Sequence, residues 1–231
     1  MLTDIIGSLR GDPEFSQRVT HWEVVPAHAG SYADIPPAVD GRIRQALLAR
    51  GIGRIYSHQL ATWDAVRAGK SVVLVSPTAS GKTLAYNLPV LQALLEDPDA
   101  RALYLFPTKA LSQDQQSELN EVVRGGEIPV KVFTYDGDTP GSIRISARDE
   151  GRIIITNPDM LHTGILPNHP KWIKALKHLR FVVIDEMHSY RGVFGSHMTS
   201  VIRRVKRIAG FYGAAPLFIC CSATIGNPHE L

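Results

Sequence analysis

The stretch VVLVSPTASGKTLAY, from Val72 to Tyr86, joins an apolar run to a small polar turn and the beginning of a helical pattern. The run is β-branched and has no polar alternation, which is typical of a strand buried on both faces of a parallel sheet. The turn resembles the phosphate-binding pattern G-x-x-x-x-G-K-[ST], but Ser76 stands where the pattern has its first glycine. The stretch predicts a strand, a phosphate-binding loop and a helix, with an unusual residue at the first loop position.

Five further apolar runs of the same kind follow along the chain, separated by helical patterns over residues 84–95, 112–123 and 198–208. Strands that alternate with helices indicate βαβ units. We therefore expect an α/β fold with a mostly parallel sheet and helices on both faces, in three α/β/α layers. The predicted strands are Ser71–Val75, Ala102–Phe106, Val130–Thr134, Arg152–Thr156, Phe181–Ile184 and Pro216–Cys221.

The first part of the chain has a different character. PAHAGSYADIPPAVD, residues 26–40, is rich in proline, alanine and glycine, and predicts an extended segment that leads to a helix over roughly Val39–Arg50. We expect an N-terminal extension over residues 1–45 and one α/β domain over residues 46–231.

Composition narrows the class of protein. The chain has 231 residues, 44% of them hydrophobic, and a net charge of +3, which fits an anionic partner without requiring one. No apolar run approaches the roughly 20 residues of a membrane span. Cys220 and Cys221 are adjacent and form neither a disulfide framework nor a C-x-x-C pattern. These features predict a cytoplasmic protein without membrane contact.

The turn SPTASGKT carries the groups that a nucleotide phosphate requires. Gly81 supplies permissive backbone, Lys82 a positive charge and Thr83 a hydroxyl for magnesium. Ser76 is small enough to replace glycine, and with Ala79 the loop carries less glycine than usual. The alternative is a chance G-K-T at a helix start, which the flanking strand and helix disfavour. The predicted ATP-binding loop consists of Ser76, Pro77, Thr78, Ala79, Ser80, Gly81, Lys82 and Thr83.

A second polar loop, in VVIDEMHSY, follows the predicted strand Phe181–Ile184. A carboxylate at a strand end that faces a phosphate loop holds Mg²⁺, which assigns Asp185, together with Thr83, to the metal. The neighbouring Glu186 is suited to orient and deprotonate a water. The alternative is a pair of surface acids, which are common at strand ends. ATP and Mg²⁺ are thus the predicted cofactors.

Three other strand ends carry weaker signals. In PTKALSQDQ, Thr108 is placed to cap a helix beginning near Lys109; in TNPDML, Pro158 fits the first helical turn after a cap at Asn157 or Thr156. Helix N-termini suit phosphates, including those of a nucleic acid, but ordinary capping explains each one taken singly. SATIGNP, after the last predicted strand, is a weak signal by itself.

Taken together, these residues resemble the superfamily 2 DExH helicases. SPTASGKT is similar to motif I, PTKALSQDQ to motif Ia, TNPDML to motif Ib, DEMH to the DEAH-type motif II, and SAT to motif III. The likeness runs from Gly51 to the C-terminus. A closer likeness, to the YprA-like group of DNA-repair helicases of the mitomycin-repair-factor type, rests on YSHQ, SPTASGKTLAYNLPVL, YDGDTP, TNPDMLH and YRGVFGSHM. The last of these argues against the Ski2-like and large-helicase-related groups.

The resemblance implies the first RecA-like lobe of an ATP-driven motor that moves on single-stranded DNA in the 3′ to 5′ direction. By the family pattern Gln59 contacts adenine, and Lys82, Asp185 and Glu186 are catalytic. Three residues, His188, Ser222 and Thr224, would couple the ATP site to the nucleic acid. The nucleic-acid contacts would be Pro107, Thr108, Lys109, Thr156, Asn157, Pro158 and Asp159, with residues 134–140, Arg144, Arg148 and Arg152 as further candidates. The basic run at residues 203–207 is interpreted as a solvated helix face.

Such motors have a second RecA-like lobe, which supplies arginine fingers and half of the nucleic-acid track. The chain has no Q-x-x-G-R-x-x-R pattern and ends seven residues after Thr224, so we expect lobe one of a larger helicase. The chain alone would then hydrolyse ATP very slowly.

Three alternatives remain open from the residues. The motor could act on RNA as a DExH RNA helicase. The chain could be another P-loop enzyme, such as a nucleotide kinase, which would need an arginine-rich lid and would not need SAT or PTKAL. It could also be a non-catalytic nucleotide-binding module, against which the intact Lys82, Asp185 and Glu186 speak.

Overall fold

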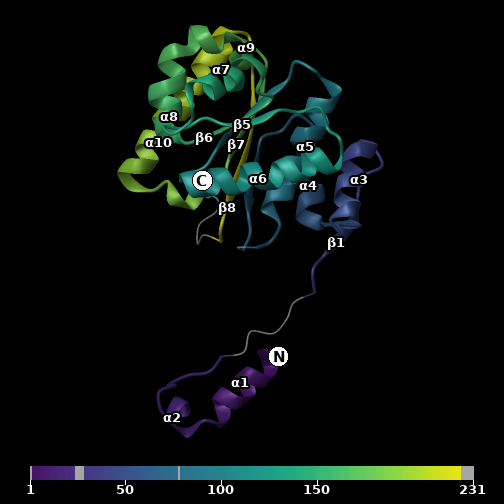
Figure 1. Cartoon of the computed structure of the whole chain (residues 1–231), viewed down its shortest axis with the longest axis vertical. Helices are drawn as coiled ribbons and strands as arrows, with labels where there is room; N and C mark the ends of the chain where they lie inside the picture. Colours follow the sequence, from purple (N-terminus) through teal and green to yellow (C-terminus); the bar gives the residue numbers. More distant parts are fainter. Residues whose placement is uncertain (1, 24–28, 78, 225–231) are drawn as a thin grey trace. The chain divides into compact units, whose positions relative to one another are not determined.

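The computed structural model describes residues 2–23, 29–77 and 79–224, and the chain divides into two units, Met1–Gly30 and Ser31–Leu231. The first unit contains α1 (Leu2–Gly11) and α2 (Pro13–Ser16), which the sequence analysis did not predict. Helix α2 begins where the Asp12 carboxylate accepts hydrogen bonds from the backbone of Glu14 and Phe15. The second unit carries all the predicted strands (Figure 1).

The second unit is built on a six-stranded sheet in the order β3-β8-β7-β4-β6-β5, in which every pairing is parallel. Each predicted strand is present, with ends that differ by at most two residues from the prediction. The strands are β3 (Val72–Val75), β4 (Arg101–Leu105), β5 (Val132–Thr134), β6 (Ile153–Thr156), β7 (Leu179–Ile184) and β8 (Leu217–Ser222).

Alternate residues of the inner strands enter two separate cores. The edge strand β3, predicted to be buried on both faces, differs: only one of its residues is buried, and Val73 is 48% exposed, because among the described residues no strand or second core covers that side. In β7, Phe181 and Val183 belong to one core, whereas Val182 and Ile184 belong to the other. Successive strand side chains point to opposite faces, so a strand covered on both sides must be apolar throughout. This explains the unbroken apolar runs in the sequence and confirms the predicted α/β fold.

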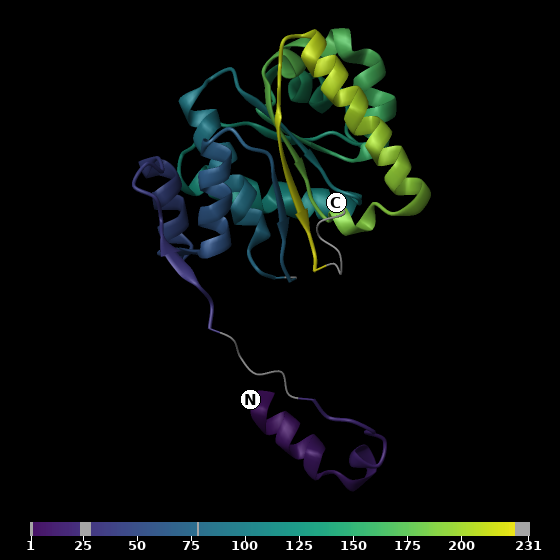
Figure 2. The same ribbon diagram turned by 180° about the vertical axis from the view of Figure 1, so that it is seen from behind.

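Helices cover both faces of this sheet, as Figures 1 and 2 show from opposite sides. One core includes side chains of α3, α4, α5 and α6, and the other includes side chains of α7, α9 and α10. The helices are α3 (Gly41–Ala49), α4 (Ser57–Arg67), α5 (Lys82–Glu96), α6 (Lys109–Gly125), α7 (Gly141–Glu150), α8 (Pro158–Met160), α9 (Ile173–Lys177) and α10 (Gly192–Phe211), with a π-helical turn at Leu161–Ile165 and 3₁₀ turns at Leu166–Trp172 and Met187–Ser189.

Backbone hydrogen bonds continue the ladder past the strand ends. Ser76 N donates to Ser222 O at 3.3 Å, Asp185 N to Leu105 O at 3.1 Å, and Phe106 N to Thr156 O at 3.1 Å. The loops after β3, β8, β7, β4 and β6 therefore leave the sheet side by side at one edge, where ligands bind in open α/β sheets.

A short antiparallel pair lies outside the main sheet. Strand β1 (Tyr32–Asp34) pairs with β2 (Arg54–Tyr56), which places Tyr32 opposite Tyr56. Ile35, Val39 and Ile43 are buried in the same core as α5 and α6. The packed unit thus includes residues 31–45, which the sequence analysis assigned to the extension.

In the described part of the chain no helix is both long and apolar enough to span a membrane. Cys220 and Cys221 are free, buried thiols of β8. Burial raises the pKa of Cys220 to about 11, so this thiol stays protonated near neutral pH.

Arg152 has a structural position. Its guanidinium donates to the backbone carbonyls of Leu94, Asp97 and Ala100 at 2.7–2.8 Å, which closes the turn between α5 and β4. These bonds hold the side chain at the end of the sheet opposite the ligand edge, because Arg152 precedes β6. Its candidacy as a nucleic-acid contact is therefore not supported.

We predict that Arg152→Gln lowers the free energy of unfolding by roughly 1–3 kcal/mol, because partly buried carbonyls lose charged donors. Urea unfolding followed by circular dichroism measures this. Arg203→Gln, on the exposed side of α10, is the matched control and should change stability by less than about 0.5 kcal/mol. Equal losses in the two variants would contradict the structural role of Arg152.

Candidate functional site

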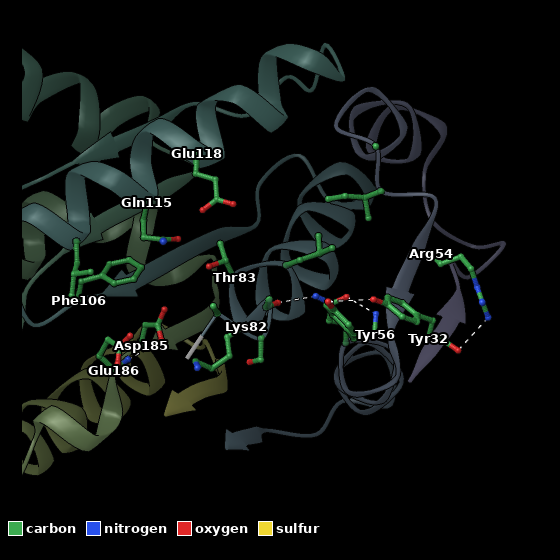
Figure 3. A pocket seen from close by; sticks show the side chains of 18 residues that line it. Tyr32, Arg54, Tyr56, Lys82, Thr83, Phe106, Gln115, Glu118, Asp185 and Glu186 are labelled. Atoms are coloured by element: carbon green, nitrogen blue, oxygen red, sulfur yellow. Dashed lines mark hydrogen bonds between the residues drawn. The ribbon is translucent and has the colours of Figure 1, made fainter. Parts of the chain in front are cut away.

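A pocket of about 610 Å³ opens at the ligand edge, between the loop after β3 and the N-terminal part of α6 (Figure 3). It brings together residues from six segments of the chain. The lining includes Tyr32, Arg54, Tyr56, Gln59, Ala79, Ser80, Gly81, Lys82, Thr83, Phe106, Gln115, Glu118, Asp185 and Glu186. The predicted nucleotide residues Gln59, Lys82, Thr83, Asp185 and Glu186 thus share one cavity.

The loop after β3 explains the two departures from the usual phosphate-loop pattern. The Ser76 hydroxyl lies 2.6 Å from the Ser80 hydroxyl, so these side chains hydrogen-bond across the loop in a way glycine could not. Ala79 has φ +58° and Gly81 has φ +78°, both in the left-handed region. Glycine adopts that region without strain, which explains the preference for it at the position of Ala79. Thr78 lies outside the described residues.

Lys82 is folded back onto its own loop. Its Nζ donates to the carbonyls of Pro77 at 2.8 Å and Ser76 at 3.1 Å, and the residue is only 9% exposed. A buried ammonium needs such partners, since an unpaired charge is costly to bury. A phosphate would therefore replace two loop carbonyls as the partner of Lys82.

Gln59 links the start of α4 to the phosphate loop. Its Oε1 accepts from Tyr56 N at 2.8 Å, and its Nε2 donates to Gly81 O at 2.8 Å. A Cβ added at Gly81 would lie 2.6 Å from Gln59 Nε2, so a side chain there would displace this amide, and φ +78° would strain it as well. The amide that the family resemblance assigns to adenine is thus occupied in holding the loop.

The pocket has an aromatic wall that the sequence analysis missed. The rings of Tyr32 and Tyr56 stack with centroids 4.8 Å apart, and Arg54 Nη2 donates to Tyr32 O at 3.3 Å. Tyr56 lies in the quoted YSHQ, so an aromatic residue near Gln59 was a usable signal. Tyr32 gave none, because only the β1–β2 pairing brings it to the pocket. Flat aromatic faces beside a phosphate loop suit a nucleobase.

Asp185 ends β7 inside the pocket, 6% exposed. Its Oδ1 accepts from Glu186 N at 2.8 Å and its Oδ2 accepts from the Tyr86 hydroxyl at 3.1 Å. Burial, and to a lesser degree the charge of Glu186, raises the pKa of Asp185 above its ordinary value. The carboxylate is therefore held in place at an electrostatic cost.

Glu186 has φ +50° and ψ +42°, a left-handed conformation that is strained for glutamate. Its Oε2 lies 3.2 Å from His188 Nε2, while His188 Nδ1 accepts from Ala223 N at 3.1 Å. Because Nδ1 accepts, the ring proton is on Nε2, facing Glu186. His188 thus connects the acid to the segment after β8.

The other two predicted coupling residues lie on either side of Ala223. Ser222 is fully buried and its hydroxyl has no hydrogen-bond partner among the described atoms. Thr224 is exposed. The geometry links His188 to the backbone between them rather than to either hydroxyl.

The loops after β4 and β6 form the neighbouring part of the edge. Thr108 caps α6 as predicted, accepting from Leu111 N, and Asn157 rather than Thr156 caps α8. Lys109 is exposed, as is Asp159, whose Oδ1 lies 3.4 Å from His197 Nε2; Pro107 and Asn157 are partly exposed. Pro158 is buried. Thr156 is 1% exposed, and its hydroxyl donates to Tyr135 O at 2.6 Å, so it is not presented at the surface.

The donor set in the pocket fits a magnesium ion. Mg²⁺ prefers a few hard oxygen ligands and completes its shell with water and substrate phosphates. The Thr83 hydroxyl and the Asp185 carboxylate are such oxygens in one cavity. No cluster of three or more histidine, cysteine or acidic side chains that could hold a metal occurs among the described residues.

We predict that Gln59→Glu weakens the binding of ATP and GTP alike, by roughly tenfold each. The change replaces the amide N–H that donates to Gly81 O by a carboxylate oxygen, which cannot donate, so the phosphate loop loses this hydrogen bond. Isothermal titration calorimetry with both nucleotides measures this. Gln113→Glu, an exposed change on α6, controls for the added charge. A loss confined to ATP would instead mean that Gln59 reads the base.

We predict that Asp185→Asn stabilises the nucleotide-free chain by roughly 0.5–2 kcal/mol and abolishes magnesium-dependent nucleotide binding. Both hydrogen bonds survive, because the new amide can accept from Glu186 N and donate to the Tyr86 hydroxyl, which itself donates to Gln115 at 2.9 Å. The raised pKa means that the folded state binds the proton more tightly than the unfolded state. The cost of the charge is therefore present at neutral pH and disappears as pH falls through that pKa.

Thermal unfolding between pH 4 and pH 8 tests this prediction. The stability difference between Asp185→Asn and the original chain should be largest at neutral pH and shrink on acidification. Asp114→Asn, on the exposed side of α6, serves as the control. A lower melting temperature for Asp185→Asn would contradict the prediction.

Comparison with known proteins agrees with this geometry. The family model of the DEAD/DEAH box helicases matches residues 56–231. An uncharacterised ATP-dependent helicase of Bacillus subtilis, YprA, is 54% identical over 230 residues, which are 100% of this chain and 30% of YprA. The ATP-dependent helicase HRQ1 of Saccharomyces cerevisiae is 37% identical over 233 residues, covering 98% of this chain and 21% of HRQ1.

A solved structure extends the likeness to three dimensions. The crystal structure of the DUF1998 helicase MrfA bound to DNA and AMPPNP superimposes with a TM-score of 0.92 and 53% identity, over 99% of this chain and 32% of that one. The chain therefore spans about a third or less of the length of these relatives. The predicted RecA-like fold and the predicted likeness to YprA-type helicases are confirmed, and the chain belongs to the DEAD/DEAH box helicase family.

Proposed function

We propose that this chain is the ATP-binding lobe of an ATP-dependent helicase that moves on single-stranded DNA and takes part in DNA repair. The observation that carries the proposal is the shared pocket of Lys82, Thr83, Asp185 and Glu186, at the same edge as the exposed Lys109 after β4 and the exposed Asp159 after β6. The named activities of YprA and HRQ1, and the DNA and AMPPNP bound to MrfA, support it. A cytoplasmic location belongs to the same proposal.

In this proposal the chain binds the nucleotide before it acts on it. The faces of Tyr32 and Tyr56 receive the base, and Lys82 leaves the carbonyls of Ser76 and Pro77 to contact the phosphates. Thr83 and Asp185 would hold Mg²⁺, which when bound neutralises charge on the phosphate oxygens. The aromatic wall explains base binding without moving Gln59 from the loop.

Glu186 is the residue that acts on the attacking water. As a carboxylate it accepts a hydrogen bond from the water and takes its proton as the water oxygen bonds to the terminal phosphorus; the bond from that phosphorus to the bridging oxygen breaks, and ADP and inorganic phosphate are the products. The His188 Nε2–H faces the same carboxylate at 3.2 Å and fixes its orientation. The strained backbone of Glu186 is consistent with a side chain positioned for catalysis rather than for stability.

His188 also connects the ATP site to the segment after β8, and so could couple ATP to the nucleic acid. It joins Glu186 to the backbone of Ala223, and β8 lies between β3 and β7 in the sheet. A movement of the segment after β8 would therefore change the hydrogen bond that orients Glu186. The second RecA-like lobe of the proposed motor would contact this edge and supply arginine fingers, whose absence costs roughly 10³–10⁵ in rate.

We predict that Glu186→Gln, in a protein that carries both lobes, lowers the ATPase rate stimulated by single-stranded DNA at least about 100-fold while leaving ATP affinity within about threefold. Steady-state phosphate release with and without oligonucleotide measures the rate. This chain alone should turn over ATP far more slowly than the two-lobe protein.

Three results would contradict the proposal. Turnover that ignores nucleic acid and requires a small phosphate acceptor would indicate a kinase. Stimulation by single-stranded RNA but not DNA would indicate an RNA helicase. Turnover by this chain alone at the two-lobe rate would rule out a need for the second lobe.

A further inference from the structure

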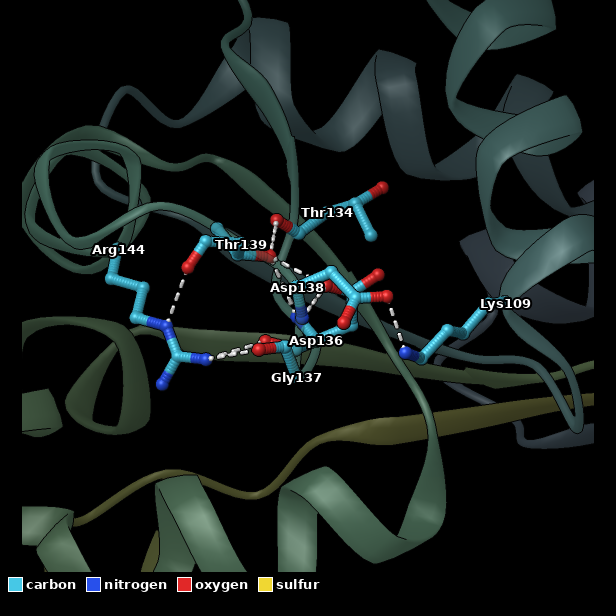
Figure 4. A network of polar contacts seen from close by, with 7 residues as sticks. All are labelled: Lys109, Thr134, Asp136, Gly137, Asp138, Thr139 and Arg144. Carbon is cyan, nitrogen blue, oxygen red and sulfur yellow. Dashed lines mark hydrogen bonds and ion pairs between the residues drawn. The ribbon is translucent and has the colours of Figure 1, made fainter.

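Lys109, at the first position of α6, forms an ion pair with Asp138 in the loop after β5 (Figure 4). The Lys109 Nζ lies 2.5 Å from Asp138 Oδ2, and the two side chains are 48% and 78% exposed. The hydrogen bond to Asp138, with a further contribution from Asp136, raises the pKa of Lys109. The exposed ammonium of Lys109, which follows β4 at the ligand edge, is thus already paired with a carboxylate of the same chain.

The loop that carries Asp138 is held by its own side chains. The buried Asp136 carboxylate accepts from Asp138 N at 2.9 Å and from the Thr139 hydroxyl at 2.8 Å. Asp136 N in turn donates to Thr139 Oγ1 at 2.9 Å. A Cβ added at Gly137 would lie 3.9 Å from Lys109 Nζ, so the tip of the loop lies against the lysine.

Arg144 of α7 braces the same loop from the other side. Its Nε donates to Thr139 O at 2.8 Å, and its Nη2 donates to Asp136 O at 2.8 Å and Gly137 O at 3.0 Å. Figure 4 shows Arg144 and Lys109 on opposite sides of the loop. Three loop carbonyls accept hydrogen bonds from Arg144, while Asp138 on the same loop is directed at Lys109. Arg144 therefore acts as a support for the loop.

We propose that the Asp138 carboxylate binds Lys109 where a nucleic-acid phosphate would otherwise bind it. An incoming strand must then displace this carboxylate of the protein itself. The inference rests on the proposed function, in which Lys109 contacts the strand backbone. An exposed ion pair is weak in water, so a phosphodiester can replace it. The same competitor helps the strand to leave, since Lys109 always has a partner to return to. Such a site favours repeated release over tight binding, which suits a motor that moves along its strand.

The inference predicts how charge removal changes binding. Without Asp138 the ammonium is free to meet the phosphate and the edge loses one repelling charge. Asp138→Asn should therefore tighten binding of single-stranded DNA roughly two- to fivefold near 0.1 M salt, where exposed charges are partly screened. It should also steepen the slope of log affinity against log salt by up to about 0.7, the value per contact on a single strand.

The experiment measures fluorescence anisotropy of a labelled oligothymidylate against this chain at several KCl concentrations. The variants are Asp138→Asn, Lys109→Ala and the double variant, with circular dichroism as a folding check. Glu150→Gln is the matched control, because Glu150 also pairs with an exposed lysine, Lys131, but at the opposite end of β5. Asp138→Asn should tighten binding, Lys109→Ala should weaken it, and Asp138→Asn should gain less than half as much when Lys109 is absent.

The outcomes separate the two proposals. If Lys109→Ala weakens binding but Asp138→Asn gains no more than Glu150→Gln, the competitor role of Asp138 is wrong and the nucleic-acid edge stands. An equal gain with and without Lys109 also overturns the competitor role, because it reflects general repulsion. If the chain does not bind the oligonucleotide, or Lys109→Ala leaves its affinity unchanged, the proposed edge fails and the inference falls with it.

Discussion

Parallel pairing of β7 between β4 and β8 is the constraint on which the rest of the structure depends. Parallel strands end at the same edge, so the ladder decides which loops become neighbours. It places Asp185, after β7, beside the ends of β4 and β8. On the other side of β8, the hydrogen bond from Ser76 N to Ser222 O brings the loop after β3 to the same edge. The cost falls on the inner strands: helices on both faces bury every residue of β4 and β6 and all but one of β7, which requires apolar side chains at nearly every position.

Polar function at the edge of such a sheet has a stability cost. Asp185 is a buried carboxylate whose charge is opposed by its surroundings, and Glu186 has a backbone conformation unfavourable for its side chain. Tyr86, Glu186 N and His188 hold these groups in place despite the cost. Positions that break a local rule and are nevertheless firmly held are expected at functional sites.

Three groups that the sequence analysis expected to meet a ligand are each bound to the protein itself, and in the proposed binding mode Lys82 and Lys109 exchange that partner whereas Gln59 keeps it. Lys82 donates to loop carbonyls, Gln59 joins Tyr56 to Gly81, and Lys109 pairs with Asp138. Leaving a buried donor or cation unpaired is costly, so ligand binding is an exchange of partners rather than a simple addition. Net affinity then depends on the difference between internal and external partners, a natural arrangement for a protein that must also release what it binds.

Much of this protein was determined by the sequence alone. Apolar runs separated by helical patterns indicated the strands of a covered parallel sheet. SPTASGKT and IDEMH, at strand ends, already indicated one nucleotide site, because parallel strands end at the same edge. The tertiary structure decided what depends on contacts distant along the chain. It brought Tyr32 to the pocket by pairing β1 with β2, tied Gln59 to Gly81, buried Thr156 and committed Arg152 to backbone carbonyls. It also paired the Ser76 hydroxyl with Ser80 and the Asp138 carboxylate with Lys109. The physical reason is that hydrophobic periodicity is a local property of the sequence, whereas the contacts of a side chain depend on how the whole chain folds.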